Sequence, residues 1–231
     1  MTGHRPETHL ILFDCDGTLV DSHRHIIAVM QQALARCGLP SPDDTEIAAV
    51  IGLSLDTAMA QLLPDNDTAH RRHLADTYRN LYQDMPVNHG LHAGVCSTLV
   101  TLQERGYCLG IVTGKSLRGL ERVLEIFDLS KFFMVYRTAD QCPSKPHPGM
   151  VMACMEELGI DAGRTTVVGD ACVDMQMAGA SGAGAIGVSF GVASSEALIA
   201  AGAGAVVDRF DALMAYFPPL RQRTASSTIA P

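Results

Sequence analysis

Two aspartates separated by one residue, Asp14 and Asp16, are the residues of this sequence best placed for chemistry. They follow four apolar residues, 10–13, whose unbroken run predicts a fully buried strand, and Gly17 ends that run. Two carboxylates at the end of a buried strand require a nearby cation or a shared proton. A turn is the alternative, because Asp and Gly are common turn residues, but a turn leaves Asp14 unexplained. We therefore expect a ligand site at this strand end.

Further polar side chains follow the later predicted strands, at Thr113, Lys145, Asp170 and Asp174. The carboxyl ends of parallel strands meet at one edge of an open sheet, so we expect these groups to converge with the first two aspartates. Carboxylates with water and substrate oxygens suit Mg²⁺, while a lysine and a threonine hold phosphoryl oxygens. Backbone N–H groups after Asp16 would add anion-binding dipoles. Together these groups supply the positioning, the nucleophile and the charge neutralisation that phosphoryl transfer needs.

Each of these later groups could also have a plainer structural role. Thr113 and Gly114 would suit an ordinary strand-to-helix turn. Asp174 could cap the helix that follows it, and Lys145 could be a solvated surface residue. The chain has only three lysines, however, and one of them lies at this place.

Alternating strands and helices must position these side chains. Apolar runs predict strands at 108–112, 132–136, 165–168, 185–188 and 205–207, and helical spacing predicts helices at 95–105, 117–127, 150–158 and 175–180. Strands that alternate with helices of this length imply right-handed crossovers and a parallel sheet. The expected fold class is α/β, with a doubly wound, Rossmann-like parallel sheet as its core.

An all-helical insert, 22–89, interrupts this alternation directly after the first strand. Four short helices are expected there, from Ile26 towards Gly38 and at 43–51, 54–63 and 68–84. The predicted domains are an α/β core at 1–21 and 90–217, a helical-bundle cap at 22–89, and a flexible tail at 218–231. Because the insert leaves the core beside the two aspartates, we expect it to act as a lid that excludes water.

The composition limits the classes of partner. The 231 residues carry a net charge of −8 and contain no basic run, which argues against nucleic acids and membranes as partners. The first residues lack an apolar signal core, so we expect a cytoplasmic protein, either a monomer or a homodimer. None of the seven cysteines has Cys-x-x-Cys spacing, so reduced thiols are expected. Cys15 and Cys172 lie inside the motifs; small apolar spacers are the favoured role for both, and redox sensitivity is the alternative.

Four segments in order, 14–22, 112–115, 144–148 and 168–174, resemble the motifs of the haloacid dehalogenase superfamily. The resemblance is to the subgroup with a helical cap after the first strand. Between 51 and 189 the chain is most similar to the phosphoglycolate phosphatase-like branch. Because all four motifs occur in the family's order, the resemblance is far more specific than any one of them.

The resemblance implies a catalytic role for each motif residue. Asp14 would be the nucleophile and would form an aspartyl-phosphate intermediate. Asp16 would protonate the leaving alkoxide and then activate the hydrolytic water. Thr113 would donate a hydrogen bond to phosphoryl oxygens, and Lys145 would offset charge between the nucleophile and the phosphate.

The resemblance also implies a Mg²⁺ cofactor. Asp14, Asp170 and the backbone carbonyl of Asp16 would bind the ion, and Asp174 would bind it directly or hold one of its water ligands. Ala171 stands where this branch usually has Ser or Thr. The missing hydroxyl is expected to lower metal affinity by up to about 10–100-fold without removing a direct ligand, so activity should survive.

Residue types separate the reactions of the superfamily. Asp16 favours phosphoryl transfer over dehalogenation, which needs no such general acid. The absence of any lysine between Leu19 and Gly114 argues against phosphonate cleavage and against a sugar phosphomutase. A phosphomonoesterase is therefore expected, with phosphoglycolate favoured as its substrate. Inorganic pyrophosphatase, a sugar-phosphate phosphatase or phosphomutase, and more remotely a non-catalytic regulatory module are the alternatives.

The expected partner is a small phosphorylated metabolite. Its predicted contacts are Gly17, Gly114, Gly52, Ser54 and Arg24, with His23, His25, Arg71, Arg72 and His92 as further candidates to meet a carboxylate or second phosphate. The loop 52–54 is the preferred candidate, by resemblance to the family.

Overall fold

The structure is a computed structural model that describes residues 8–85 and 89–220. At its centre is a parallel sheet of six strands in the order β3-β2-β1-β4-β5-β6. The strands are β1 (Leu10–Phe13), β2 (Cys108–Thr113), β3 (Val135–Thr138), β4 (Thr165–Gly169), β5 (Gly184–Val188) and β6 (Ala205–Val207). This arrangement confirms the doubly wound α/β core.

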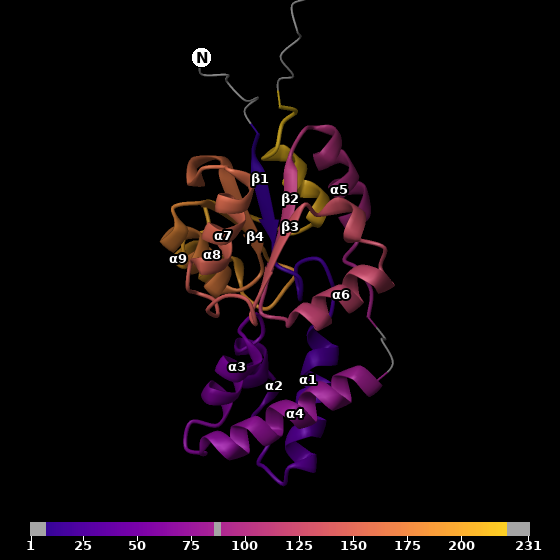
Figure 1. The fold of residues 1–231 in the computed structure, drawn as a ribbon, viewed down its shortest axis with the longest axis vertical. Coiled ribbons are helices and arrows are strands. Elements are labelled where there is room, and N and C mark those ends of the chain that lie inside the picture. The colour runs from indigo at the N-terminus through magenta and orange to yellow at the C-terminus, as the bar shows by residue number, and fades with distance from the viewer. Residues whose placement is uncertain (1–7, 86–88, 221–231) are drawn as a thin grey trace, which may run out of the picture.

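Helices cover both faces of the sheet (Figure 1). One face carries α5 (Val95–Glu104), α6 (Leu117–Ile126) and the 3₁₀ helix η3 (Phe210–Ala215), and the other carries α7 (Gly149–Leu158), α8 (Cys172–Ser181) and α9 (Ser195–Ala200). Side chains alternate along β1, so that Ile11 and Phe13 join one buried cluster while Leu10 and Leu12 join the other. The continuous apolar run of β1 thus follows from burial on both faces.

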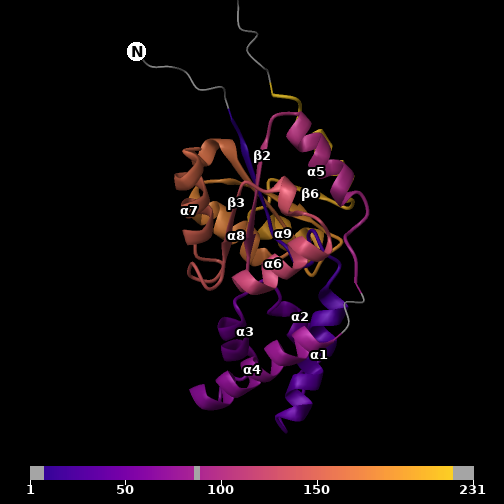
Figure 2. The same cartoon turned by 45° about the vertical axis from the view of Figure 1, so that its right-hand side comes forward.

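The remaining α-helices form a block of their own beyond the carboxyl ends of the strands (Figures 1 and 2). They are α1 (His23–Arg36), α2 (Asp44–Ala49), α3 (Leu55–Leu62) and α4 (Thr68–Asp84), and we call them the helical block. A separate buried cluster that includes Leu34, Met59 and Leu74 holds them together. Ser54 and Asp67 cap α3 and α4 by accepting hydrogen bonds from backbone N–H groups.

The structure differs from the predicted elements at three places. The strand expected at 132–136 is β3 at 135–138, because Phe132 ends a short 3₁₀ turn and packs into the core from there. Helix α8 starts earlier than the predicted 175, since Asp174 accepts a hydrogen bond from the backbone N–H of Ala171. Helix α9 was not predicted, although Ser194 caps it.

The chain remains attached to the core beyond the predicted boundary at 217. Tyr107 donates its hydroxyl hydrogen to the Pro218 carbonyl at 2.9 Å, and the Leu220 N–H donates to the Arg105 carbonyl at 2.9 Å. The rest of the predicted tail lies outside the described residues. Within residues 8–85 and 89–220, no helix combines the length and apolar character that crossing a membrane requires.

Candidate active site

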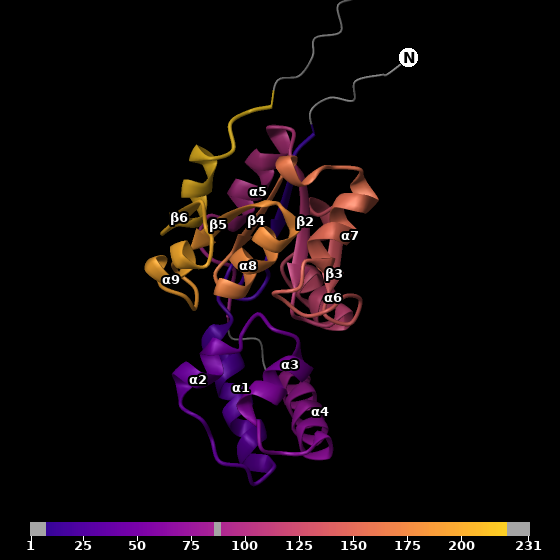
Figure 3. The same ribbon diagram turned by 90° about the vertical axis from the view of Figure 1, so that its left-hand side faces the viewer.

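The carboxyl ends of the parallel strands face the helical block (Figure 3). Asp14 follows β1, Thr113 ends β2 and Asp170 follows β4, so these polar residues lie at that edge of the sheet. The Asp14 N–H donates to the Val168 carbonyl at 2.9 Å, which continues the pairing of β1 with β4. Asp14 is 1% exposed and Asp16 is 8% exposed. Both carboxylates therefore depend on partners within the protein, as the sequence predicted.

Lys145 lies between two of these carboxylates. Its Nζ donates hydrogen bonds of 2.6 Å to Asp14 Oδ1 and to Asp174 Oδ1. Burial raises the pKa of both Asp14 and Asp174, and the ammonium opposes that rise. Burial alone would lower the pKa of Lys145, but the two carboxylates raise it above its usual value, so the lysine is charged. The solvated surface position considered for Lys145 is thus excluded.

Three aspartates form a cluster suited to a metal ion. Asp14, Asp170 and Asp174 each present one carboxylate oxygen, and these oxygens all lie within 4.8 Å of one another. Asp14 Oδ2 is buried and has no hydrogen-bond partner among the described residues. Thr18 Oγ1 donates to Asp170 Oδ1 at 2.8 Å, which orients that carboxylate. A buried set of carboxylate oxygens with one unpartnered oxygen fits a hard divalent cation such as Mg²⁺.

Asp174 caps α8, which is one of the roles considered for it in the sequence, and its role toward a metal ion stays a prediction. Its Oδ2 accepts the hydrogen bond from Ala171 N–H at 3.1 Å and so caps α8, while its Oδ1 faces Lys145. Ala171 itself is buried and offers no hydroxyl to the cluster.

The side chain of Asp16 lies apart from this cluster and has its own partners. Ser22 Oγ donates to Asp16 Oδ1 at 2.6 Å, and Lys115 Nζ lies 2.9 Å from Asp16 Oδ2. Burial alone would raise the pKa of Asp16, but Lys115 and then Ser22 lower it below its usual value. The two aspartates of the opening motif therefore have separate environments.

Lys115 is the residue that the sequence reasoning missed. It directly follows Thr113 and Gly114 in the sequence. The chain has only three lysines, so a lysine at this place was the available signal of a functional role. Thr113 is buried at the end of β2, where its Oγ1 accepts a hydrogen bond of 3.2 Å from the Lys115 N–H. A contact of Thr113 with phosphoryl oxygens stays a prediction.

The predicted substrate loop 52–54 does lie against the sheet edge. A Cβ on Gly114 would lie within 3.0 Å of the backbone carbonyl oxygens of Gly52 and Leu53. The Ser54 N–H donates to Ser144 Oγ at 2.8 Å. Gly114 thus allows the helical block to approach the core as closely as it does.

Gly17 and His23 lie beside Asp170. A Cβ on Gly17 would lie within 3.0 Å of both side chains, and the Gly17 φ of +83° also favours glycine. His23 Nε2 lies 3.1 Å from Asp170 Oδ2. Burial alone would lower the pKa of His23, but Asp170 raises it above its usual value. His23 thus contacts a predicted metal ligand rather than open space above the site.

The three arginines predicted as substrate contacts are either exposed or bonded within the helical block. Arg24 and Arg72 are exposed. Arg71 donates hydrogen bonds to the carbonyls of Leu63 and Pro64, so it holds together the helical block rather than facing the carboxylates.

The two remaining histidine candidates take part in ring contacts. The His25 ring is 5.2 Å from that of Tyr82, and the His92 ring is 4.5 Å from that of Phe190. Neither contact joins the carboxylate cluster.

The two cysteines of the motifs are both free thiols. Cys15 is buried, and burial raises the pKa of its thiol well above the usual value, which keeps it protonated and unreactive. Cys172 is partly exposed, and its Sγ lies 3.7 Å from the Ala197 carbonyl oxygen.

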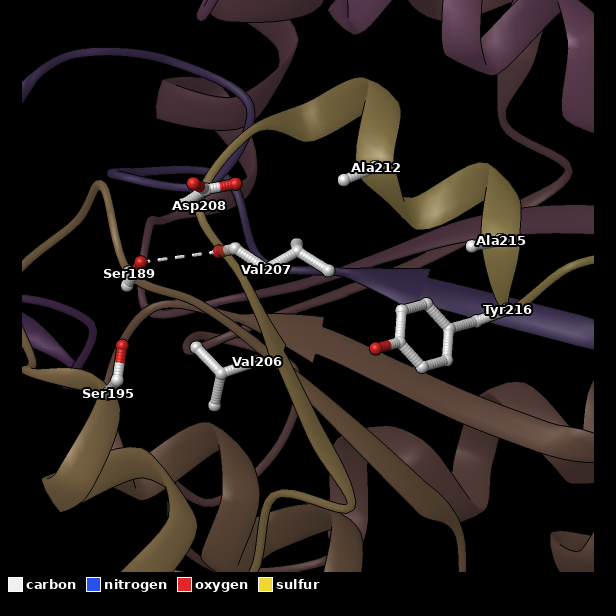
Figure 4. Close-up of a pocket in the computed structure, with 8 residues that line it drawn as sticks. All are labelled: Ser189, Ser195, Val206, Val207, Asp208, Ala212, Ala215 and Tyr216. Carbon is white, nitrogen blue, oxygen red and sulfur yellow. Dashed lines mark hydrogen bonds between the residues drawn. The ribbon is translucent and has the colours of Figure 1, made fainter.

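A separate cavity of about 450 Å³ lies along β6 and η3 (Figure 4). Its lining includes Ser189, Asp208 and Tyr216, and none of Asp14, Asp16, Asp170 and Asp174 borders it. The candidate active site is therefore distinct from this cavity and is defined by its own side chains.

Comparison with known proteins identifies the family of this chain. The family profile described as haloacid dehalogenase-like hydrolase matches residues 11–188. The chain belongs to this family of hydrolases, as the order of its four motifs predicted.

Curated relatives extend the comparison over most of the chain. "Probable phosphatase IndB" from Dickeya dadantii (strain 3937) is 37% identical and covers 87% of this chain and 90% of its own length. "Phosphoglycolate phosphatase, plasmid" from Cupriavidus necator is 32% identical over 94% of this chain and 96% of its own length. "Pyrophosphatase PpaX" from Bacillus pumilus is 33% identical over 81% of this chain and 86% of its own length. These names confirm the expectation of a hydrolase of the phosphatase type.

Solved structures share the fold. A hydrolase from Pseudomonas syringae superposes with a TM-score of 0.82 at 24% identity, covering 90% of this chain and 97% of its own. The haloacid dehalogenase-like protein SP0104 from Streptococcus pneumoniae gives 0.79 at 22% identity, covering 91% and 99%.

Proposed function

We propose that this protein is a Mg²⁺-dependent phosphomonoesterase that acts through an aspartyl-phosphate on Asp14. The observation that carries the proposal is the pairing of Asp14 with Lys145 beside two further carboxylates, while Asp16 stands apart with its own partners. Two carboxylates of one motif in different environments suit two different tasks, nucleophile and proton carrier.

The nucleophile is prepared by its surroundings. Lys145 holds Asp14 Oδ1 in place, and Asp14 Oδ2 has no hydrogen-bond partner among the described residues. One oxygen of a carboxylate fixed in this way can attack a phosphorus atom in line with the leaving group, while the other oxygen would bind the metal ion. Thr113 and the N–H groups near Gly17 and Gly114 would donate hydrogen bonds to the phosphoryl oxygens.

Asp14, Asp170, Asp174 and the backbone carbonyl of Asp16 would hold the Mg²⁺ ion. When bound, the ion supplies positive charge to the phosphoryl oxygens. Thr18 and the Val192 N–H fix the Asp170 carboxylate with hydrogen bonds of 2.8 and 3.0 Å. These bonds prepare the site for metal, because they hold a ligand in place without using Asp14.

Asp16 would carry the proton. It would protonate the leaving alkoxide and then remove a proton from the water that hydrolyses the aspartyl-phosphate. Lys115 and Ser22 favour its ionised form in the free protein. A phosphoryl dianion bound beside it raises the pKa of the carboxyl and so favours the protonated form needed for the first step.

The helical block, 22–89, would be a cap on a core formed by 1–21 and the residues from 90 onwards. Gly114 against the carbonyl of Leu53, and Ser144 against Ser54, bring the block onto the strand ends. Such a cap would exclude bulk water from the aspartyl-phosphate until the hydrolytic water is placed.

Phosphoglycolate is the favoured substrate. A relative that covers nearly the whole chain at 32% identity bears this name. Inorganic pyrophosphate is the second candidate, because the Bacillus pumilus relative at 33% identity is a pyrophosphatase by name.

The test is hydrolysis of a generic aryl phosphate, phosphoglycolate, pyrophosphate and sugar phosphates with and without Mg²⁺. Asp14→Asn should lower Mg²⁺-dependent turnover by about 10³-fold or more, because no carboxylate remains to attack. Asp65→Asn is the matched control, since Asp65 is exposed in the helical block. Equal activity in the Asp14 variant and the control would overturn the nucleophile assignment, and activity without Mg²⁺ would overturn the metal assignment.

A further inference from the structure

Lys115 is a buried cation at the junction of the core and the helical block, and the proposed phosphoryl chemistry gives it no contact with the substrate. Its side chain is 9% exposed. Its backbone is fixed on both sides, because its N–H donates to Thr113 Oγ1 at 3.2 Å and its carbonyl accepts from the Ala139 N–H at 3.0 Å. The lysine is therefore held in place from its backbone onwards.

The ammonium of Lys115 connects the two parts of the molecule. Its Nζ lies 2.9 Å from Asp16 Oδ2 in the core and donates a hydrogen bond of 3.1 Å to the Tyr82 hydroxyl of α4. It also lies 4.9 Å from the centre of the Tyr82 ring, and the Tyr78 ring is 5.7 Å from that ring. An ammonium carries three N–H donors, and the contacts with described residues account for two of them. One donor remains for a ligand.

Other cations of the site region are exposed or already engaged. Within the helical block, Arg24, Arg36 and Arg72 are exposed, while Arg71 and Arg79 bind carbonyls or carboxylates of the block. Arg122 of the core donates to the Gln83 carbonyl, and Lys145 is held between two carboxylates. Lys115 is thus the described cation best able to meet a second anionic group at the strand ends.

We propose that Lys115, oriented by Tyr82 from the helical block, binds an anionic group on the leaving part of the substrate. The proposal deepens the function proposed above and rests on it for one point, that Asp16 faces the leaving oxygen. Because Lys115 contacts Asp16 Oδ2, the anionic group of the substrate that meets Lys115 lies one or two bonds beyond the leaving oxygen. The preferred substrates are small phosphate esters or anhydrides with a carboxylate or a second phosphoryl group close to the scissile bond.

Because Tyr82 belongs to the block, the pocket for this second anion is complete only when block and core are in contact. A substrate with a neutral alcohol would lack this interaction but would keep every contact to its phosphoryl group. Substrate choice would therefore depend on one lysine of the core and one tyrosine of the block.

The experiment compares phosphoglycolate, pyrophosphate and ethyl phosphate, whose alcohol part is neutral, in the wild-type protein and in Lys115→Met. We expect the KM for the doubly anionic substrates to rise by about 10–100-fold, the loss typical of a hydrogen bond between charged groups. The KM for ethyl phosphate should change by less than about threefold. Effects that pass through Asp16 alter kcat for all three substrates alike, so the ratio of KM values isolates the binding role.

Two further variants sharpen the comparison. Lys131→Met is the matched control, because Lys131 is exposed and pairs only with Asp128 among the described carboxylates. Tyr82→Phe removes the hydroxyl and keeps the ring, so it should raise the same KM values by a smaller factor. A larger change for phosphoglycolate identifies a carboxylate as the natural partner, and a larger change for pyrophosphate identifies a phosphoryl group.

Calorimetric titration of these compounds into Asp14→Asn, alone and combined with Lys115→Met, measures binding without turnover. The added substitution should weaken binding of phosphoglycolate or pyrophosphate by about 10–100-fold and leave ethyl phosphate nearly unchanged. Equal weakening of all ligands, or none, would overturn the role of Lys115 and leave the phosphatase proposal intact. A wild-type protein that hydrolyses none of the esters would instead overturn the phosphatase proposal, and the titration would still decide the lysine's role.

Discussion

Lys145 Nζ donates a hydrogen bond of 2.6 Å to Asp14 Oδ1, and the two side chains are almost fully buried although they are 131 positions apart. This contact ties the loop before α7 to the end of β1. It also explains how several carboxylates can share one buried edge, since the ammonium offsets charge that would otherwise oppose folding.

Replacing Lys145 with methionine should therefore destabilise the protein. Removing one partner of a buried ion pair costs about 3–5 kcal/mol of unfolding free energy, because Asp14 and Asp174 keep their burial without compensation. The pKa of both carboxyls would rise further above the unfolded values, so the folded state would bind more protons than the unfolded state. Its stability then falls as pH rises and recovers as pH falls.

Urea unfolding of Lys145→Met and of the exposed control Lys131→Met, each at pH 7.5 and pH 5.5, measures this. The difference between the two variants should shrink at the lower pH, and added Mg²⁺ should restore part of the loss at the higher pH. A stability equal to that of the control at both values would show that the buried ammonium is not needed.

Asp16→Asn should block the reaction either before Asp14 is phosphorylated or after the phosphorylated protein has formed. Binding of the metal ion should be retained. We expect turnover to fall by about 10²–10⁴-fold, the usual contribution of a general acid or base. Intact-protein mass spectrometry should then show phosphorylated protein where the first step survives. Asp21→Asn is the control, since Asp21 is exposed. Unchanged steady-state rates would contradict the proton-carrying role.

Gly114→Ala should separate the helical block from the strand ends. The new Cβ would lie within 3.0 Å of the carbonyl oxygens of Gly52 and Leu53, so the loop must move. A misplacement of this kind lowers kcat/KM by about 100-fold, and overpacking costs about 1–3 kcal/mol.

Gly179→Ala provides the comparison for that variant. Gly179 lies in α8, and a Cβ there meets nothing within 4 Å, so alanine should stabilise the helix by about 0.5–1 kcal/mol and leave activity unchanged. Wild-type kinetics in Gly114→Ala would show that contact between this loop and the sheet edge has no part in catalysis.

Magnesium should stabilise the folded protein through the aspartate cluster. Binding at 100 times the dissociation constant adds about 2.7 kcal/mol, which raises Tm in a concentration-dependent way. Asp170→Asn should abolish most of this rise, while Asp208→Asn, at an exposed position, should keep it. The same rise in both variants would place the ion elsewhere.

Much of the site was predictable because its residue types are unusual where they occur. Carboxylates at the ends of apolar strands, such as Asp14 and Asp170, are costly to bury unless a ligand or a cation is nearby, and parallel strands bring such ends together. The helices of the block followed from helical spacing, and the structure has all four.

The misplaced strand shows a limit of apolar patterns. Phe132 and Phe133 continue the apolar run into β3, yet they pack on the core from a short 3₁₀ turn and the residue after it. Periodicity cannot separate such a turn from a strand, since both bury the same kinds of side chain.

Lys115 and His23 could not be placed for a different reason. Their partners Asp16, Tyr82 and Asp170 become neighbours only when the helical block lies against the sheet edge. The spacing of these residues along the chain does not predict the distances between them, because those distances depend on how the helical block packs against the core. The close approach at Gly114 depends on the same arrangement.

The place of β1 in the sheet has a consequence for how the chain reaches its native state. β1 is the first strand in sequence, but its neighbours in the sheet are β2 and β4. Leu10 therefore pairs with Cys108 and Thr165, which are far from it in sequence. The hydrogen bonds inside the helices between these strands are local, so these helices can form early, whereas the central strand closes long loops and should order late. Asp14, the proposed nucleophile at the end of β1, would then be positioned in one of the last cooperative steps of folding.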